Sequence, residues 1–278
     1  MLRGKDATLA AIIETILKEE PETQDEIAKK LNISRRYVAK LLKPLIDERI
    51  VLHPYVVDIE KLSKLDIYNR IEKPTSHIIE LLDKMGNKVL KNLDKVHKGL
   101  KTGNVEEAKS VIYQDYTLNK LEEEVNITLK MNDLKYLPPR QTALLAKIAS
   151  NIERCGDYLS NIAEEILEGL YIREYLHQDI DEIFNITKRM FTIAMDMVRD
   201  KKVSFEIYDL EEELHRKLDK IMKVLSEKEK GKTKDINYYI QFGMFLKDIE
   251  RFGDRCIKIF ETGKEFHYGE PGEGTKNR

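Results

Sequence analysis

The sequence contains two copies of a carboxylate pattern that could bind a cation. Residues 152–157 read IERCGD and residues 249–254 read IERFGD. Within each copy the glutamate and the aspartate are four residues apart, which places them on one face of a helix. Like charges at this spacing repel by about 0.2–0.5 kcal/mol, and a bound cation would relieve that repulsion. The candidate metal ligands are Glu153 and Asp157 in the first copy and Glu250 and Asp254 in the second.

A second pair of polar residues precedes each motif at the same spacing. Asp115 is followed by Asn119 in the first half, and Glu211 is followed by His215 in the second. Helices that face one another would then present a cluster of oxygen ligands, which suits Mg, Mn, Fe or Zn. The alternative is that these carboxylates lie on solvated helix faces, as charged residues commonly do. Repetition together with the Ile, Arg and Gly positions favours the metal sites.

The two motifs differ in their next charged neighbour. Lys258 lies four residues after Asp254 and could form an ion pair with it, whereas the matching residue after Asp157 is the uncharged Asn161. Because an ion pair would already neutralise Asp254, we expect the first cluster to bind metal more strongly than the second.

The motifs belong to a longer internal repeat. Residues 146–166 align without gaps onto 243–263 at an offset of 97, and seven of the 21 aligned positions are identical. Gly156 and Gly253 recur inside expected helices, where glycine costs about 1 kcal/mol relative to alanine. This repetition indicates close approach of a neighbouring helix. The repeat divides six expected helices into two three-helix units: roughly 76–101, 104–134 and 138–176, then 178–201, 203–230 and 234–266.

Three short helices are expected ahead of the repeat. The first ends at Glu20-Pro21, because proline disfavours a helical residue before it. Thr23 is placed to cap the second helix, with Glu26 at the spacing of a capping box. Ser34 can cap the third helix. The inward side chains of the third helix should be Val38, Leu41, Leu42, Leu45 and Ile46.

Two short strands should follow, at residues 50–52 and 55–57, joined by a turn at His53-Pro54. The hydrophobic periodicity then weakens and Pro74 interrupts it, which predicts a linker at 58–75. The glycine-rich residues 268–278 should be disordered. The expected division of the chain is therefore 1–57, 58–75, 76–176, 177–267 and 268–278.

Residues 23–51 resemble the winged helix-turn-helix of many prokaryotic regulators, with Ser34 to Asp47 as the recognition helix. The early part of that helix carries four cations and no acid, so its exposed face can meet phosphates and base edges. Pro44 would kink the helix or end the part that enters the groove. Tyr37 could contact DNA or pack against the wing. The candidate DNA-binding residues are Ser34, Arg35, Arg36, Tyr37, Lys40 and Lys43.

The alternative is that this module docks another protein, because residues 1–57 carry ten cations and nine acids and are almost neutral. We favour DNA because the cations are concentrated on the face that would be read. Arg35 and Arg36 are expected to contact DNA, and a homodimer is expected because two half-sites raise the affinity of such modules.

Composition excludes several classes of protein. With 48 Lys+Arg against 50 Asp+Glu the net charge is −2, which excludes a wholly basic nucleic-acid coat. Only 13 Gly and 7 Pro are present, which favours long helices over an all-β fold. No apolar stretch predicts an export signal or a membrane-spanning helix. The two cysteines, Cys155 and Cys256, are expected to be small buried thiols in a reducing cytoplasm.

A ferritin-like di-iron enzyme is a competing interpretation, since it requires Glu-x-x-His motifs on two helices of a four-helix bundle. Glu174-x-x-His177 and Glu212-x-x-His215 match that spacing. However, the first lies at an expected helix junction, and each unit counts three helices. No nucleotide-binding or nucleophile motif predicts another enzyme. We therefore expect a protein that is not an enzyme.

The two hexamers, Asn161-Ile162-Ala163-Glu164 after the first of them, and Leu81-Leu82-Asp83-Lys84-Met85 resemble the PhoU family of phosphate-uptake regulators over about residues 75–266. The resemblance implies a mainly α fold in which two repeated three-helix bundles follow the winged helix. It also implies multinuclear metal clusters of Fe or Zn, with Mg or Mn as alternatives. By position, Asp115 would join Glu153 and Asp157, and Glu211 would join Glu250 and Asp254. Asn119 and His215 stand where the family more often has a carboxylate.

The resemblance further implies a role in limiting phosphate uptake. We expect a cytoplasmic, phosphate-responsive regulator that binds DNA through residues 1–57 and receives metal, phosphate or partner information through the bundles. The alternative is a docking adaptor that inhibits the ATPase subunit of a phosphate transporter without binding DNA.

Overall fold

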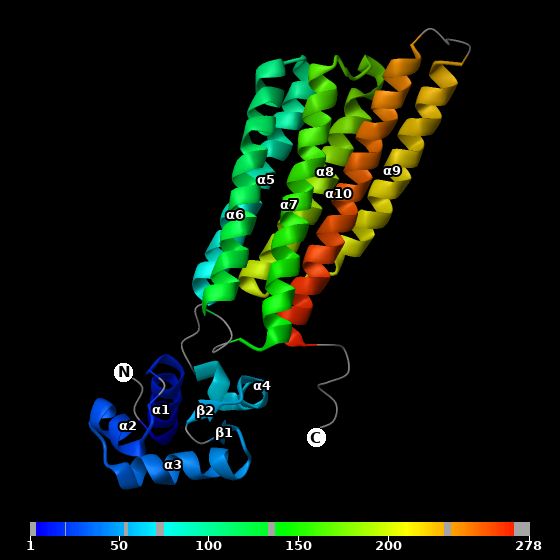
Figure 1. The fold of residues 1–278 in the computed structure, drawn as a ribbon. Coiled ribbons are helices and arrows are strands. Elements are labelled where there is room, and N and C mark those ends of the chain that lie inside the picture. Colours follow the sequence, from blue (N-terminus) through cyan, green and yellow to red (C-terminus); the bar gives the residue numbers. More distant parts are fainter. Residues whose placement is uncertain are drawn as a thin grey trace. The chain divides into compact units, whose positions relative to one another are not determined.

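The chain folds into two compact units, drawn in Figure 1. The computed structural model describes residues 4–19, 21–52, 55–70, 75–132, 137–230 and 235–269. The first unit comprises Met1–His77 with Thr128–Ala143, and the second comprises Ile78–Ile127 with Leu144–Arg278. Among the helices in these described ranges, none combines the length and the apolar character that a bilayer crossing requires.

The first unit begins with the three predicted helices, and their caps follow the sequence signals. The Glu26 amide donates to Thr23 Oγ1 at 3.3 Å, and the Glu22 amide donates to the Glu26 carboxylate at 3.1 Å. Asn32 ends the second helix with a left-handed φ of 52°. The Tyr37 amide donates to Ser34 Oγ at 3.2 Å, which caps the third helix. The helices are α1 (Lys5–Glu19), α2 (Gln24–Leu31) and α3 (Arg35–Asp47).

A two-stranded antiparallel sheet follows α3, as predicted. Strand β1 (Val51–Leu52) pairs with β2 (Val56–Val57), with Val51 opposite Val57 and Leu52 opposite Val56. The predicted turn at His53-Pro54 lies outside the described residues. Pro44 does not end α3, which continues to Asp47. The exposed face of the recognition helix is therefore longer than an interruption at Pro44 would allow.

The prediction that Ile46 points inward is wrong. Val38, Leu41, Leu42 and Leu45 are buried as expected, but the Ile46 side chain is 40% exposed. The helix ends one residue later and the chain turns at Arg49, whose φ is 55°. Ile50, after this turn, is 3% exposed and enters the core instead.

Much of the expected linker is part of the first unit. Residues 59–62 form the short helix α4 (Ile59–Leu62), and residues 66–70 form the 3-10 helix η1 (Asp66–Arg70). Ile59, Leu62 and Tyr68 join the hydrophobic core that contains Ile12, Leu42 and their neighbours. The apolar side chains are too irregularly spaced to show a helical period, which is why the sequence pattern did not reveal them. Pro74 lies outside the described residues, as do residues 270–278 of the expected disordered tail.

Six long helices follow within the described residues, in the number that the repeat predicts. Figure 1 shows them running side by side along their lengths. Helices α8, α9 and α10 pack on one another to form the second three-helix group. The six helices are α5 (Thr75–Thr102), α6 (Val105–Asn132), α7 (Pro139–Leu167), α8 (His177–Asp200), α9 (Glu206–Lys228) and α10 (Ile236–Tyr268).

Helix α7 is shorter than the predicted range of 138–176. It ends at Leu167 because Gly169 adopts a φ of 103°, a conformation that favours glycine, and the Leu170 amide then donates back to the Glu165 carbonyl at 2.8 Å. A 3-10 helix, η2 (Glu174–Leu176), precedes α8. The break between the two three-helix groups is thus set by Gly169 rather than by the region around His177.

The two repeated glycines mark close helix contacts, as predicted. A Cβ atom on Gly156 would lie 2.5 Å from Leu118 Cδ1 of α6, and a Cβ atom on Gly253 would lie 2.7 Å from Leu214 Cδ2 of α9. Leu118 and Leu214 are 1% exposed. The same leucine-on-glycine contact therefore locks the motif helix to its neighbour in both halves of the repeat.

Candidate functional site

The first carboxylate cluster lies where α6 and α7 face one another. Asp115 of α6 accepts hydrogen bonds from Asn119 Nδ2 and from Ser160 Oγ of α7, both at 3.2 Å. Glu153 and Asp157 of α7 are partly buried, and their charges interact. The structure therefore brings Asp115, Glu153 and Asp157 into one acidic region, which we call the first cluster.

Burial and mutual repulsion raise the carboxylate pKa values in the first cluster. The pKa of Glu153 rises to about 7, because the side chain is desolvated and lies near the charges of Asp157 and Glu122. The pKa of Asp157 is also raised, by desolvation and by the charge of Asp115. Glu122 was missed in the sequence, although it lies seven residues after Asp115, a spacing of two helical turns. An all-oxygen donor set of this kind suits a hard cation.

The second cluster, formed by Glu211 and His215 of α9 with Asp254 of α10, is more compact. One potential ligand atom from each of these residues lies within 4.8 Å of the others. Burial and the nearby charges of Asp254 and Glu261 raise the pKa of Glu211, while His215 acts in the opposite direction. Among the described residues, only this group brings three candidate ligands of metal-binding type so close together.

Glu250 lies at the edge of the second cluster. Its carboxylate is 3.9 Å from His215 Nδ1, and it accepts a hydrogen bond from Lys247 Nζ at 2.7 Å. The expected ion pair between Lys258 and Asp254 does not form among the described residues; Lys258 instead lines a separate surface groove. Lys258 therefore does not neutralise Asp254, and the expectation that the first cluster binds metal more strongly loses its basis.

The recognition helix α3 presents its cations unequally. Arg35 Nη1 lies 3.3 Å from Asp25 of α2 in an exposed ion pair. Tyr37 is partly buried against the core of the first unit, so packing takes up part of its surface. Among the described residues, no acid pairs with the three remaining cations, which are exposed and recur on one helical face. We call them the basic stripe: Arg36, Lys40 and Lys43.

Comparisons with known proteins agree with this architecture. Two segments, residues 82–166 and 180–262, match the PhoU domain, and residues 5–51 match a winged helix-turn-helix DNA-binding family. The chain belongs to the PhoU family. Each matched PhoU segment contains one of the two carboxylate clusters, and the winged helix precedes both.

Several relatives of this PhoU protein share its length or its fold. An uncharacterized protein of Methanocaldococcus jannaschii is 52% identical over 271 residues, covering 98% of this chain and 93% of that protein. The crystal structure of PhoU from Pseudomonas aeruginosa has a TM-score of 0.64 at 18% identity, covering 70% of this chain and 98% of that one. The phosphate transport system regulatory protein PhoU from Streptococcus pneumoniae has a TM-score of 0.57 at 22% identity, covering 70% and 95%.

The remaining sequence candidates have structural roles in this PhoU protein. The His177 imidazole is 3.1 Å from the Ile172 carbonyl oxygen, and Glu174 lies in the 3-10 helix before α8, so this pair does not form the helical motif of a di-iron site. Cys155 and Cys256 are both free and buried, as expected. Burial and the neighbouring Cys155 thiol raise the pKa of Cys256, which keeps it protonated.

Proposed function

We propose that this PhoU protein is a phosphate-responsive regulator that binds DNA through its winged helix and a metal through its helical repeats. The observation that carries the DNA-binding part is the basic stripe on a capped, exposed helix. Cationic side chains on such a helix raise the affinity of the protein for DNA, because their binding releases counterions from the DNA phosphates. The phosphate-responsive part is supported by the two PhoU domains and by the similar fold of the phosphate transport system regulatory protein PhoU from Streptococcus pneumoniae.

Residues in the first turn of a recognition helix contact base edges, and later residues contact the backbone. By this rule Ser34 and Arg36 would contact bases, while Lys40 and Lys43 would contact phosphates. Arg35 contributes less, because DNA must first compete with Asp25 for its guanidinium. A homodimer would place two such helices on two half-sites, which is how many winged helix regulators reach useful affinity.

The metal part of the proposal rests on the donor chemistry of the two clusters. The imidazole of His215 and the carboxylates of Glu211 and Asp254 fit a borderline cation such as Zn, Fe or Mn. The first cluster offers oxygen donors only and fits Mg or Mn better. A bound cation would supply positive charge that holds the acidic residues of neighbouring helices together, and cluster growth to several ions would recruit Glu250.

Selection of DNA by the full chain tests the proposal. The wild-type protein is used to enrich binding sites from duplexes with a randomised core, and the enriched duplex becomes the probe in a band-shift assay. Charge reversal at two stripe positions, Arg36→Glu with Lys40→Glu, should abolish binding. Lys64→Glu is the matched control, because Lys64 is an exposed cation of the same unit outside α3. Unchanged affinity of the folded stripe variant at about 150 mM salt would show that α3 does not contact DNA.

A docking adaptor that inhibits the ATPase subunit of a phosphate transporter is the second candidate function. The wing favours it, because Leu52 and Val56 are 45% and 57% exposed and could contact a protein surface. This candidate predicts that no duplex is enriched. It also predicts that the purified ATPase subunit binds the wild-type chain and loses affinity for a Leu52→Ser and Val56→Ser variant.

A further inference from the structure

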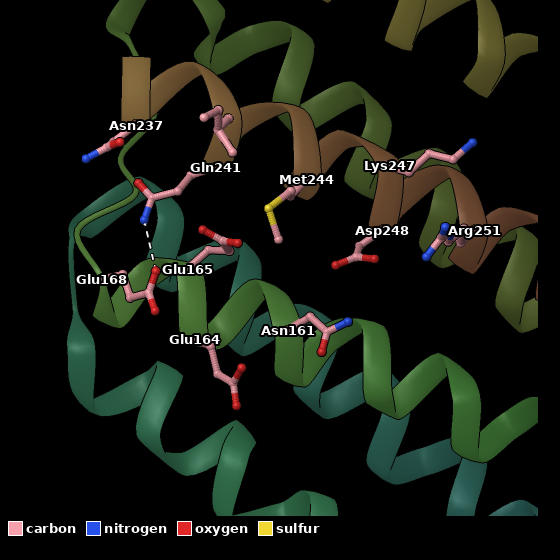
Figure 2. A pocket seen from close by; sticks show the side chains of 11 residues that line it. Asn161, Glu164, Glu165, Glu168, Asn237, Gln241, Met244, Lys247, Asp248 and Arg251 are labelled. Carbon is pink, nitrogen blue, oxygen red and sulfur yellow. Dashed lines mark hydrogen bonds between the residues drawn. The ribbon is translucent and has the colours of Figure 1, made fainter. Parts of the chain in front are cut away.

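A surface groove between α7 and α10 has an unusual charge pattern. It has a volume of 710 Å³. Four acidic residues line it: Glu164 and Glu165 of α7, Glu168 just after the end of α7, and Asp248 of α10. Figure 2 shows Glu165 pointing toward α10, whereas the Glu164 carboxylate points away from it. We call this the acidic groove.

The buried carboxylate of Glu165 has an oxygen atom that finds no donor among the described residues. Its side chain is 7% exposed and points into the groove, and among the described residues its Oε2 atom makes no hydrogen bond. Burial and the charges of Glu168, Asp248 and Glu164 raise the pKa of Glu165. A buried acceptor without a donor is costly in a native structure and points to a missing ligand group.

The two cations that line the groove, Lys247 and Arg251, act on acids other than Glu165. Lys247 Nζ donates to Glu250 at 2.7 Å, on the side of the second cluster. Burial raises the pKa of Asp248, which is 8% exposed, while a hydrogen bond from Asn161 and the charge of Arg251 act in the opposite direction. Glu168 accepts a hydrogen bond from Gln241 at 3.2 Å. Glu165 is therefore the member of the groove that is left without compensation.

The internal repeat provides a matched comparison. A second groove of 540 Å³ lies between the same two helices and is lined by the repeat-equivalent residues at the offset of 97. At the position of Glu165 it has Thr262, and at the position of Asp248 it has Asn151. Asn151 is satisfied there, since it donates to the Lys147 carbonyl at 2.7 Å and accepts from Arg255 at 3.3 Å.

The second groove shows that packing of α7 on α10 does not require buried carboxylates. Its equivalent positions are neutral, and both Thr262 and Asn151 are buried, at 3% and 7% exposure. Lysine and arginine side chains line this second groove, whereas acidic side chains dominate the first. The two buried acids are therefore a property of the acidic groove alone, which favours a ligand over a structural role.

Shape and composition select the kind of cation. The carboxylates of the acidic groove do not converge on one point, because among the described residues the compact group of candidate metal ligands is the second cluster. Ile240 and Met244 line the groove and are 55% and 53% exposed, so they offer apolar surface between the charges. A ligand whose ammonium groups are separated by methylene chains matches a groove in which the carboxylates are spaced apart and the wall between them is apolar.

We propose that the acidic groove binds a linear aliphatic polyamine, with one ammonium group donating to Glu165 and others reaching the carboxylates of Asp248 and Glu168. The methylene chain lies against Ile240 and Met244. This assignment is independent of the DNA-binding and metal-binding roles proposed above.

Spermidine titration into the full chain at about 150 mM salt tests the proposal, with binding measured by calorimetry. Glu165→Gln keeps the shape of the side chain and removes its charge, and it should weaken spermidine binding by about tenfold or more. Glu261→Gln is the matched control, because Glu261 is the repeat-equivalent of Glu164 and lies in the second groove. It should bind as the wild type does. Asp248→Asn provides a second groove variant if Glu165→Gln fails to fold.

A local readout separates site binding from general attraction. Spermidine should shift the methyl resonance of Met244 in methionine-labelled protein, and Mg²⁺ at equal charge concentration should leave it unchanged. Equal loss of affinity in the Glu165 and Glu261 variants would reduce the effect to diffuse electrostatics and overturn the proposal. Displacement of spermidine by equimolar Mg²⁺ would overturn it in favour of a metal site, and no spermidine binding would overturn it outright.

Discussion

Leu214 Cδ2 occupies the space beside Gly253, so closely that a Cβ atom on the glycine would lie 2.7 Å away. The repeat reproduces the relationship between Leu118 and Gly156. Each contact joins a motif helix to the helix that supplies the other candidate ligands. The spacing of the candidate ligands therefore depends on a leucine whose side chain has no ligand atom.

Gly253→Ala should lower the free energy of unfolding relative to Gly243→Ala, by about 1–3 kcal/mol. Both glycines lie in α10, so both substitutions gain the same helix propensity. An added Cβ at Gly243 meets nothing within 4 Å, whereas at Gly253 it overlaps Leu214. Urea unfolding of both variants measures the difference. Adding Leu214→Val to Gly253→Ala should restore part of the lost stability. If the effects of the two substitutions on the free energy of unfolding simply add, the contact between Leu214 and residue 253 is not responsible for the loss.

Metal content should depend more on the second cluster than on the first. After loading with Zn²⁺ and desalting, a variant with His215→Gln and Asp254→Asn should retain less zinc per chain than one with Glu153→Gln and Asp157→Asn. The reason is that the second cluster adds an imidazole to two close carboxylates, whereas the first cluster offers oxygen donors only. Elemental analysis provides the measurement, with Glu227→Gln of α9 as an exposed control. Equal zinc in all four proteins would assign these residues to solvated helix faces.

The salt dependence of DNA binding should separate the cations of α3. Lys40→Ala and Lys43→Ala should each reduce the slope of log K against log salt by about 0.9, the value for one phosphate contact. Arg35→Ala should weaken binding less than Arg36→Ala, because Arg35 is already paired with Asp25. Fluorescence anisotropy across a salt series gives both quantities. An effect of Arg35→Ala equal to that of Arg36→Ala would mean that the Asp25 pair opens on binding.

His267 should make stability depend on pH. Burial and the charge of Lys201 lower its pKa, although its Nε2 lies 2.9 Å from the Val198 carbonyl oxygen. The unfolded chain then binds more protons than the folded chain as pH falls below the ordinary histidine value. The stability contributed by neutral His267 is present above that value and lost as pH falls through the lowered pKa. The thermal unfolding temperature should fall less steeply between pH 8 and pH 5 in His267→Gln than in the wild type. Parallel curves for the two proteins would contradict this assignment.

Local signals in the sequence predicted most of the secondary structure. Thr23, Ser34 and Asn32 act within one helical turn, so their effects are readable from residue type and spacing alone. The six long helices and the repeat glycines were readable for the same reason, because helical periodicity and an unexplained glycine are properties of neighbouring positions. The linker was misjudged, since Ile59, Leu62 and Tyr68 become core residues only through partners distant in the chain.

The sequence by itself determined the fold class, the repeated carboxylate motifs and the basic stripe, because each follows from spacing along one helix. Only the tertiary structure decided which motif residues converge: His215 joins Glu211 and Asp254, Glu250 remains at the edge, and Lys258 turns to another groove. Only the tertiary structure, too, buried Glu165 at a groove where its Oε2 atom meets no donor from the described residues. The physical reason is that ligand geometry and burial depend on how two helices rotate about their axes when they pack, and contacts between side chains far apart in sequence set that rotation.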